Sequence, residues 1–193
     1  MQIVRGYFKD SRDNDSDRIV TESLDRSRTF DDRAVRSASG PTVFISHKHN
    51  DLPDLKGFLL YLTNHYNVVP YIDSMDRKLP DMTNAETALR IKSVIESCDR
   101  FILLATNNAL KSKWCNWEVG IADKTKYSSH YMAVLPMYEI GSNKYEGNEY
   151  LGIYPYIDED VDSKGNSILV VKYNTKEGRK KISLKDWLNK SNK

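Results

Sequence analysis

Trp114 and Glu118 stand four residues apart in the segment Trp114-Cys115-Asn116-Trp117-Glu118. In a helix, residues at this spacing share a face, with their Cβ atoms about 6 Å apart. A carboxylate beside an apolar wall could accept hydrogen bonds from ribose hydroxyls and stabilise the positive charge that develops when a glycosidic bond breaks. Glu118 is therefore the first candidate for a catalytic residue. The same spacing also occurs in ordinary helices, where the ring packs into the core and the glutamate lies at the solvated edge.

Length and charge limit the classes of protein that fit. The 193 residues suffice for one domain with a sizeable core and an additional extension. The net charge of +2 comes from 29 basic and 27 acidic residues that are interspersed, so no single-sign run indicates nucleic acid or a membrane surface as a partner. Apolar runs such as Phe101 to Ala105 are far shorter than the roughly 20 residues that span a bilayer. We expect a cytoplasmic protein with neither a nucleic-acid nor a membrane partner.

Cysteine and histidine usage argues against a metal site. Cys98 and Cys115 are too few for a disulfide framework or a cysteine zinc site, and His47 and His49 form the only close histidine pair. We therefore assign no metal. Cys115 could be mistaken for a nucleophile, but no histidine stands nearby in sequence to activate it, and a free cysteine beside tryptophan is usually buried packing.

The chain divides into an N-terminal extension, residues 1–40, and a regular domain, residues 41–193. The stretch from Asp10 to Gly40 is rich in Asp, Arg and Ser and poor in large apolar residues, which is typical of a flexible or peripheral segment. Within the extension we expect a short strand at residues 1–7 and one helical turn near residues 19–24.

From residue 41 onward, strands and helices alternate. Uncharged runs rich in β-branched and aromatic residues predict strands buried on both faces, and apolar stripes at helical spacing predict helices between them. This alternation indicates right-handed crossovers, and so a flavodoxin-like α/β fold with a central parallel sheet of about five strands between two helical layers. A long ordered loop is expected at residues 145–157. The expected strands are 42–46, 68–72, 101–105, 131–137 and 168–173. The expected helices are 51–66, 84–97, a segment that follows Asn108, carries Glu118 and runs toward residue 126, and 184–189.

In an open parallel sheet, ligands bind beyond the carboxyl ends of the strands. The residues that directly follow the first three expected strands are Ser46 to Asn50, Asp73 to Asp81 and Thr106 to Asn108. These segments, together with the helix that carries Glu118, should line any binding site.

Four motifs in this order resemble the Toll/interleukin-1 receptor (TIR) domain family, in its bacterial form. They are Val43-Phe44-Ile45-Ser46-His47 on the first strand, Tyr71-Ile72-Asp73 ending the second, the loop from Met75 to Thr83, and Ser112-Lys113-Trp114-Cys115-Asn116-Trp117-Glu118. The last matches the family's tryptophan-x-x-x-glutamate motif. The resemblance is strongest over residues 41–140.

The resemblance implies an activity. Many bacterial TIR proteins cleave NAD+ at the nicotinamide–ribose bond and release ADP-ribose or a cyclised isomer, and those of Thoeris antiphage defence use the product to activate a downstream effector. By the same resemblance, Glu118 corresponds to the catalytic glutamate and Trp114 to the aromatic residue of the motif. NAD+ is then the substrate, and no separate cofactor is required. The members also self-associate through their TIR surfaces.

Further substrate-binding candidates follow from position. Ser46 and His47 come after the first strand and could contact the nicotinamide riboside or the pyrophosphate, although both are equally ordinary loop residues. Asp73 closes the second strand at the mouth of the expected cleft, where it could also cap the following turn. Lys78 lies in the loop that family members use for self-association and for gating the pocket.

The sequence alone leaves competing functions open. A non-catalytic TIR scaffold that acts by homotypic assembly would use Glu118 only as a helix-surface carboxylate. A phosphorylated receiver domain fails, because its phosphoacceptor aspartate should follow the third strand, where Thr106-Asn107-Asn108 stands instead. A nucleoside deoxyribosyltransferase shares a glutamate and a nucleoside glycosidic bond and is harder to exclude.

Overall fold

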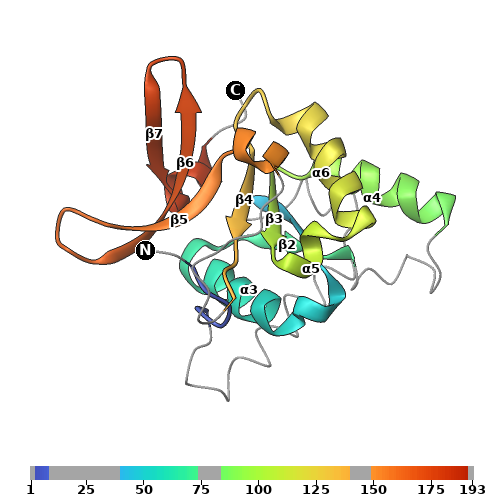
Figure 1. The fold of residues 1–193 in the computed structure, drawn as a ribbon, viewed down its shortest axis with the longest axis horizontal. Helices are drawn as coiled ribbons and strands as arrows, with labels where there is room; N and C mark the ends of the chain where they lie inside the picture. Colours follow the sequence, from blue (N-terminus) through green and yellow to red (C-terminus); the bar gives the residue numbers. More distant parts are fainter. Residues whose placement is uncertain (1–2, 9–39, 74–83, 140–148, 191–193) are drawn as a thin grey trace.

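The computed structural model describes residues 3–8, 40–73, 84–139 and 149–190 (Figure 1). Within these ranges the chain forms one mixed sheet of seven strands in the order β2-β1-β3-β4-β5-β6-β7. The strands from β2 to β5 pair in parallel, and β6 and β7 continue the sheet in antiparallel fashion. The parallel part has the flavodoxin-like order, so the predicted fold class is confirmed. The strands are β1 (Thr42–Ser46), β2 (Val69–Tyr71), β3 (Arg100–Ala105), β4 (Met132–Pro136), β5 (Tyr156–Val161), β6 (Ser167–Thr175) and β7 (Gly178–Ser183).

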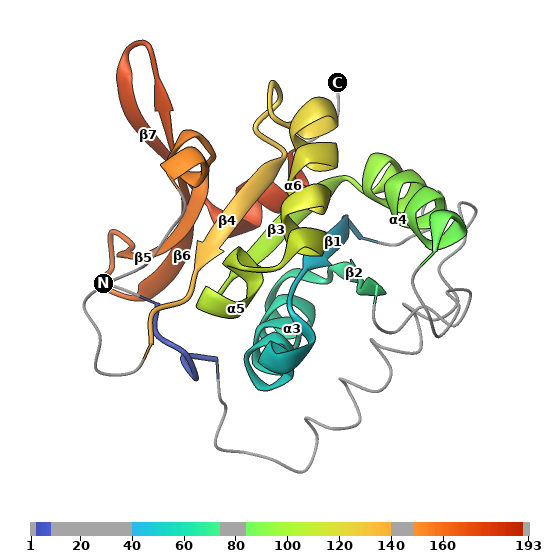
Figure 2. The same ribbon diagram turned by 45° about the vertical axis from the view of Figure 1, so that its right-hand side comes forward.

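Helices cover both faces of the sheet and give three layers. One core contains side chains of α3 and α7, and the other contains side chains of α4 and α6 (Figure 2). The predicted helix boundaries hold closely, except that Asn107 and Asn108, expected to precede the helix with Glu118, lie in a short helix of their own, α5, before α6. The helical elements are η1 (His49–Asp51), α3 (Leu52–Tyr66), α4 (Ala85–Ser97), α5 (Asn107–Leu110), α6 (Lys113–Lys126), η3 (Glu149–Ile153) and α7 (Leu184–Asn189).

Strand β1 shows why the sheet needs cover on both faces. All five of its residues are buried, with Val43 and Ile45 in the core beside α3 and Phe44 in the core beside α4 and α6. The Phe44 ring stacks on Tyr71 and Phe101, with ring centroids 5.3 and 5.6 Å apart. Strand β1 carries no charged side chain, as expected for a strand buried on both faces, and it ends at a small polar residue, Ser46.

The C-terminal part of the sheet differs from the prediction. Residues 149–157 are not a loop: they contain η3 and the start of β5, the fifth parallel strand. The run predicted as the fifth parallel strand, residues 168–173, lies in β6, which pairs antiparallel with β5. Strand β5 reads Tyr-Ile-Asp-Glu-Asp-Val. Its three acidic residues interrupt the uncharged run by which the other strands were predicted.

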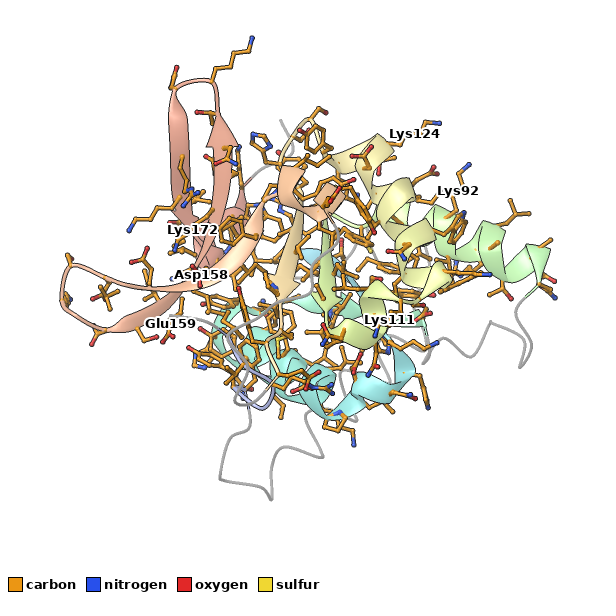
Figure 3. All side chains as sticks on the ribbon, in the orientation of Figure 1. Lys92, Lys111, Lys124, Asp158, Glu159 and Lys172 are labelled. Carbon is orange, nitrogen blue, oxygen red and sulfur yellow. The ribbon has the colours of Figure 1, made fainter. Side chains whose placement is uncertain are left out.

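Strands β5, β6 and β7 form two hairpins that project from the body of the domain (Figure 1). Their charged residues pair across the strands, as Lys172 Nζ does with Asp158 Oδ2 at 2.7 Å (Figure 3). Lys181 pairs with Asp160 in the same way at 2.8 Å. These pairs let a strand with three consecutive acidic residues remain in the sheet.

Residues 3–8 pack into the domain that was predicted to begin at residue 41. Ile3 and Phe8 are buried in the core beside α3, and Val4 forms an isolated parallel bridge with Tyr138 just beyond β4. This bridge is all that the described residues show of the predicted strand at 1–7. The close approach needs Gly57 on α3, since a Cβ there would lie 2.8 Å from the Phe8 carbonyl oxygen. The predicted helical turn near residues 19–24 lies outside the described ranges.

A helix that crosses a bilayer must be both long and apolar. No helix within the described ranges meets both requirements.

Candidate active site

Helix α6 presents its buried face to the carboxyl end of the sheet. Its N-cap is Ser112, whose hydroxyl oxygen accepts a hydrogen bond from the Cys115 backbone N–H at 3.3 Å. The buried residues Cys115, Glu118, Val119 and Ala122 follow at helical spacing, so Glu118 belongs to the inward stripe. The helix thus directs a carboxylate toward the strand tips. A catalytic role for the motif requires this orientation.

Glu118 is 1% exposed, so its carboxylate does not point into bulk solvent. Its Oε2 accepts a hydrogen bond from the Ser46 hydroxyl, at the end of β1, with an oxygen–oxygen distance of 2.5 Å. Its Oε1 is buried and has no hydrogen-bond partner among the described residues. A buried carboxylate oxygen without a donor is costly and unusual, so its place at a strand tip calls for an explanation.

The surroundings of Glu118 disfavour its ionised form. Burial raises the pKa of Glu118 well above its usual range, and the negative charge of Asp73 raises it further. The Ser46 hydroxyl and, to a smaller extent, the Trp114 side chain act in the opposite direction on this pKa. A positive charge placed beside Glu118 would reverse this balance, because it would favour the carboxylate that burial and Asp73 disfavour.

Asp73 lies near this carboxylate, and His47 lies next to Asp73. Asp73 follows β2, and its Oδ1 is 3.8 Å from Nδ1 of His47, which follows β1. Burial lowers the pKa of the His47 imidazole, and the nearby Asp73 partly offsets that effect. Ser46, His47, Asp73 and Glu118 therefore come together at the tips of β1 and β2, as their positions in sequence predicted.

Comparison with known proteins bears on this arrangement. The profile of the TIR domain family matches residues 43–167, which include β1 to β5 and every helix that flanks the site. The chain belongs to the TIR domain family. A relative in Bacillus cereus (strain MSX-D12), named "Probable 3' cyclic ADP-D-ribose synthase ThsB'", is 31% identical over 119 residues. That match covers 60% of this chain and 59% of the relative, so the chain spans less than two thirds of the relative's length.

The tryptophans of the TIR motif pack against each other along α6. The Trp114 and Trp117 rings lie 5.0 Å apart at an interplanar angle of 36°, and both are partly buried against the core beside α4 and α6. Trp117 is therefore partly buried packing. Trp114 is close enough to influence the pKa of Glu118, which places an aromatic side chain next to the candidate catalytic carboxylate.

Cys115 is buried in the same stripe and serves as packing. Burial raises the pKa of its thiol to about 11, and its Sγ donates a hydrogen bond to the His47 carbonyl oxygen at 3.3 Å. A thiol in that state is a poor nucleophile, which agrees with the sequence argument. Among the described residues, no three His, Cys, Asp or Glu side chains are grouped where they could hold a metal ion.

Of the other residues expected at the strand tips, Thr106 and Asn108 belong to a different group. Lys78 and the loop from Met75 to Thr83 lie outside the described ranges, as does the turn that Asp73 was expected to cap. The side chains of Thr106 and Asn108 donate hydrogen bonds to Asp51, and that of Asn108 is 2.9 Å long.

This second polar cluster at the carboxyl end of the sheet was missed. It centres on Asp51, which the sequence placed only at the start of the expected helix 51–66, and it includes Arg5 from the N-terminal segment. The Asp51 side chain makes no capping bond to α3, although Asp51 does occupy the N-cap position. The polar residues after the third strand were expected at this end of the sheet, but nothing in the sequence connects them with Arg5.

Proposed function

We propose that this TIR protein cleaves the nicotinamide–ribose bond of NAD+ and releases nicotinamide together with linear or cyclic ADP-ribose. The observation that carries the proposal is Glu118: a fully buried carboxylate at the strand tips, with one oxygen held by Ser46 and the other without a donor among the described residues. The name of the Bacillus cereus relative supports a cyclic ADP-ribose product.

The chemistry suits this carboxylate. When the bond between C1′ and the pyridinium nitrogen breaks, the electron pair leaves with nicotinamide and the positive charge passes to the ribose as an oxocarbenium ion. Glu118 would face that charge in a site that excludes water, where electrostatic stabilisation is strongest, and its Oε1 would accept a hydrogen bond from a ribose hydroxyl. Water or a nucleophilic atom of the adenosine half then attacks C1′, which gives the linear or the cyclic product.

The remaining residues would bind and orient the substrate. Ser46 holds one oxygen of Glu118, so its effect on the ribose is exerted through that carboxylate. His47 and Asp73 lie at the mouth of the site, where Asp73 adds negative charge that favours a cationic nicotinamide ring over a neutral base. Trp114 provides an aromatic surface beside Glu118. We keep Lys78 as a candidate contact from the loop after β2.

We further propose that the product is a nucleotide signal in bacterial antiphage defence. In that role the protein would work in the cytoplasm, assemble through its TIR surfaces and activate a downstream effector that binds the product. No cofactor beyond the substrate would be needed. Glu118 lies at the tip of β1 with Asp73 nearby, where ligands of parallel sheets bind, and the printed name of the relative is that of a synthase, so the catalytic proposal is favoured over that of a non-catalytic scaffold.

The test compares two buried glutamates. Glu159 on β5 also accepts a hydrogen bond from a serine, Ser167, and also has one buried oxygen without a donor among the described residues, but it lies in a projecting hairpin. We expect Glu118→Gln to reduce nicotinamide release from NAD+ by about 10²-fold or more, and Glu159→Gln to leave it within about twofold. Release is followed at rising protein concentrations to allow for assembly.

Two outcomes would contradict the proposal. Equal activity of Glu118→Gln and its parent would remove Glu118 from the reaction. Faster cleavage of 2′-deoxynucleosides than of NAD+ would instead indicate a deoxyribosyltransferase, whose leaving group is neutral. Mass spectrometry of the products then identifies the linear or cyclic form.

A further inference from the structure

Arg5 ties the N-terminal segment to three carboxylates at the carboxyl end of the sheet. Its Nη2 lies 3.1 Å from Asp51 Oδ1, its Nε lies 2.9 Å from Asp54 Oδ2, and its Nη1 lies 3.2 Å from Glu139 Oε1. The side chains of Asp51 and Asp54 are 0% and 5% exposed. A planar guanidinium can satisfy several carboxylates at fixed angles, which a lysine ammonium cannot do.

Asp51 extends this contact to the third strand and to the helix that follows it. Its Oδ2 accepts from the Thr106 hydroxyl, and its Oδ1 accepts from Asn108 Nδ2 at 2.9 Å. Thr106 in turn is the N-cap of α5 and accepts from the Ala109 backbone N–H at 3.1 Å. We call Arg5, Asp51, Asp54, Thr106 and Asn108 the Arg5 clasp.

Helix α5 connects the clasp to the helix that carries Glu118. Only Lys111 and Ser112 separate α5 from α6, and Asn116 Nδ2 donates to the Leu110 carbonyl oxygen at 3.1 Å. A shift of α5 would therefore displace the first turn of α6. Glu118 lies one turn further along, and a displacement of about 1 Å at a reacting group can reduce a rate by about 10²-fold.

We propose that Arg5 is a positioning residue for the candidate active site: through Asp51 it fixes the end of β3 and α5, and thereby the orientation of α6 and Glu118. This inference rests on the proposed NAD+-cleaving function. It assigns a role in catalysis to a residue outside the range 43–167 that the family profile matches.

The N-terminal segment is built to hold Arg5 in place. The Arg5 backbone N–H donates to the Tyr138 carbonyl oxygen at 2.7 Å, and the Tyr138 N–H donates to the Ile3 carbonyl oxygen at 3.0 Å. The Gly6 N–H donates to Asp54 Oδ1 at 2.7 Å. Figure 2 shows this segment beside the end of β4 and α3. Hydrogen bonds therefore hold the backbone at Arg5 and at Gly6, which suits a residue whose side chain fixes the positions of its neighbours.

The opposite end of the same strand offers a matched control. Arg100, the first residue of β3, is a buried arginine with several hydrogen bonds: its Nε donates to the Trp187 carbonyl oxygen at 2.9 Å and its Nη1 to the Asp99 carbonyl oxygen at 2.8 Å. Arg100 lies at the amino end of the sheet, remote from the strand tips. The Arg5 side chain is 23% exposed, so Arg100→Met should cost at least as much stability as Arg5→Met, but only Arg5→Met affects the clasp.

The experiment measures the steady-state kinetics of nicotinamide release for both variants in the full chain, at a temperature where each is folded. We expect Arg5→Met to lower kcat about tenfold or more with KM within about twofold, and Arg100→Met to leave kcat within about twofold despite a lower melting temperature. An unchanged kcat for Arg5→Met, or an equal fall in both variants, would overturn the proposal. Should Arg5→Met fail to fold, Arg5→Lys takes its place with a smaller loss in the same direction, and an unchanged kcat again overturns it.

A readout that needs no turnover separates this proposal from the proposed function. Hydrogen–deuterium exchange of the backbone amides in residues 106–118 should be faster in Arg5→Met than in Arg100→Met. Equal exchange in the two variants would refute the clasp whatever the fate of NAD+. A parent that never releases nicotinamide would refute the proposed function, while the exchange result still decides whether Arg5 holds α5 and α6.

Discussion

The candidate site and the Arg5 clasp lie at the same edge of the sheet on opposite faces. The site is formed where α6 meets the tip of β1, and the clasp is formed where η1 and α3 meet the tip of β3. Each is centred on one buried carboxylate, Glu118 in the site and Asp51 in the clasp.

The two carboxylates differ in how their charge is balanced. Asp51 accepts hydrogen bonds from Arg5, Thr106 and Asn108, so both of its oxygens have donors. Glu118 accepts one, from Ser46, and its neighbour Asp73 carries the same charge. The clasp is thus a completed network that stabilises the fold, whereas the site lacks the positive charge that a cationic substrate would supply.

The largest effect on stability is expected from Asp51→Ala. It leaves the Arg5 guanidinium and the Thr106 and Asn108 side chains without their shared partner, and breaking a buried ion pair from one side costs about 3–5 kcal/mol of unfolding free energy. Urea denaturation followed by circular dichroism measures the loss.

Glu177→Ala is the control for this loss. Glu177 pairs with Lys180 on the surface, and its side chain is 76% exposed. Its removal should cost less than about 1 kcal/mol. Similar losses in the two variants would show that the clasp is no more important to the fold than a surface ion pair.

Glu118→Gln should have the opposite effect on stability, and the effect should depend on pH. The pKa of Glu118 is raised in the folded state, so as pH rises the unfolded chain releases this proton first and the folded protein loses stability. The loss begins near the ordinary glutamate pKa and ends above the folded-state pKa, and each pH unit between these two limits lowers the unfolding free energy by about 1.4 kcal/mol. Glutamine has no such loss, so the variant should gain stability over the parent as pH rises.

Urea denaturation of parent and Glu118→Gln at a series of pH values measures this gain. The two proteins should be nearly equal in stability at the most acidic pH at which both fold. A difference that stays constant with pH, or that grows toward acid, would show that the carboxylate of Glu118 is well solvated or well paired, contrary to the contrast with Asp51.

The same contrast explains what the sequence could predict. Thr42 to Ser46 and residues 101–105 are uncharged because those strands are buried on both faces, so their pattern identifies them without the structure. Strand β5 carries three acidic residues, two of which have their partners Lys172 and Lys181 on other strands, so its pattern looks like that of a loop. A local sequence pattern predicts a strand only where the burial of that strand does not depend on charge partners that are distant in sequence.

The site was predictable for a related reason. Ser46, Asp73 and Glu118 each occupy a position that topology brings to the strand tips, and the motif around Trp114 indicates which helix face they meet. Arg5 reaches Asp51 across 46 residues of sequence and through an isolated bridge at Val4. No periodicity, cap or turn signal encodes a contact of that kind.

Ser46→Ala tests how far the site depends on the hydrogen bond between Ser46 and Glu118. The hydroxyl favours the ionised form of Glu118, so its removal should raise the pKa of that carboxyl further. If the ionised form is the active one, the acid limb of the pH profile of kcat/KM moves to higher pH, and activity on that limb falls about tenfold. The measurement is nicotinamide release across a range of pH.

Ser167→Ala removes the equivalent hydrogen bond to Glu159 and is the matched control. Its pH profile should superimpose on that of the parent, because Glu159 lies in the hairpin of β5 and β6. A uniform fall in activity for Ser46→Ala, with no displacement of the acid limb, would indicate that Ser46 binds substrate directly and does not act through Glu118.

The smallest effect is expected from Cys115→Ala. Its thiol links α6 to the end of β1 through a weak bond to the His47 carbonyl oxygen, and burial holds the pKa of that thiol at about 11. Since neither thiolate chemistry nor strong positioning is available from it, kcat should stay within about threefold of the parent. The clasp on the opposite face, with its charged contacts, would then carry most of the positioning of α6. A loss from Cys115→Ala as large as that from Arg5→Met would reverse this assignment, and α6 would be held chiefly from the side of the site.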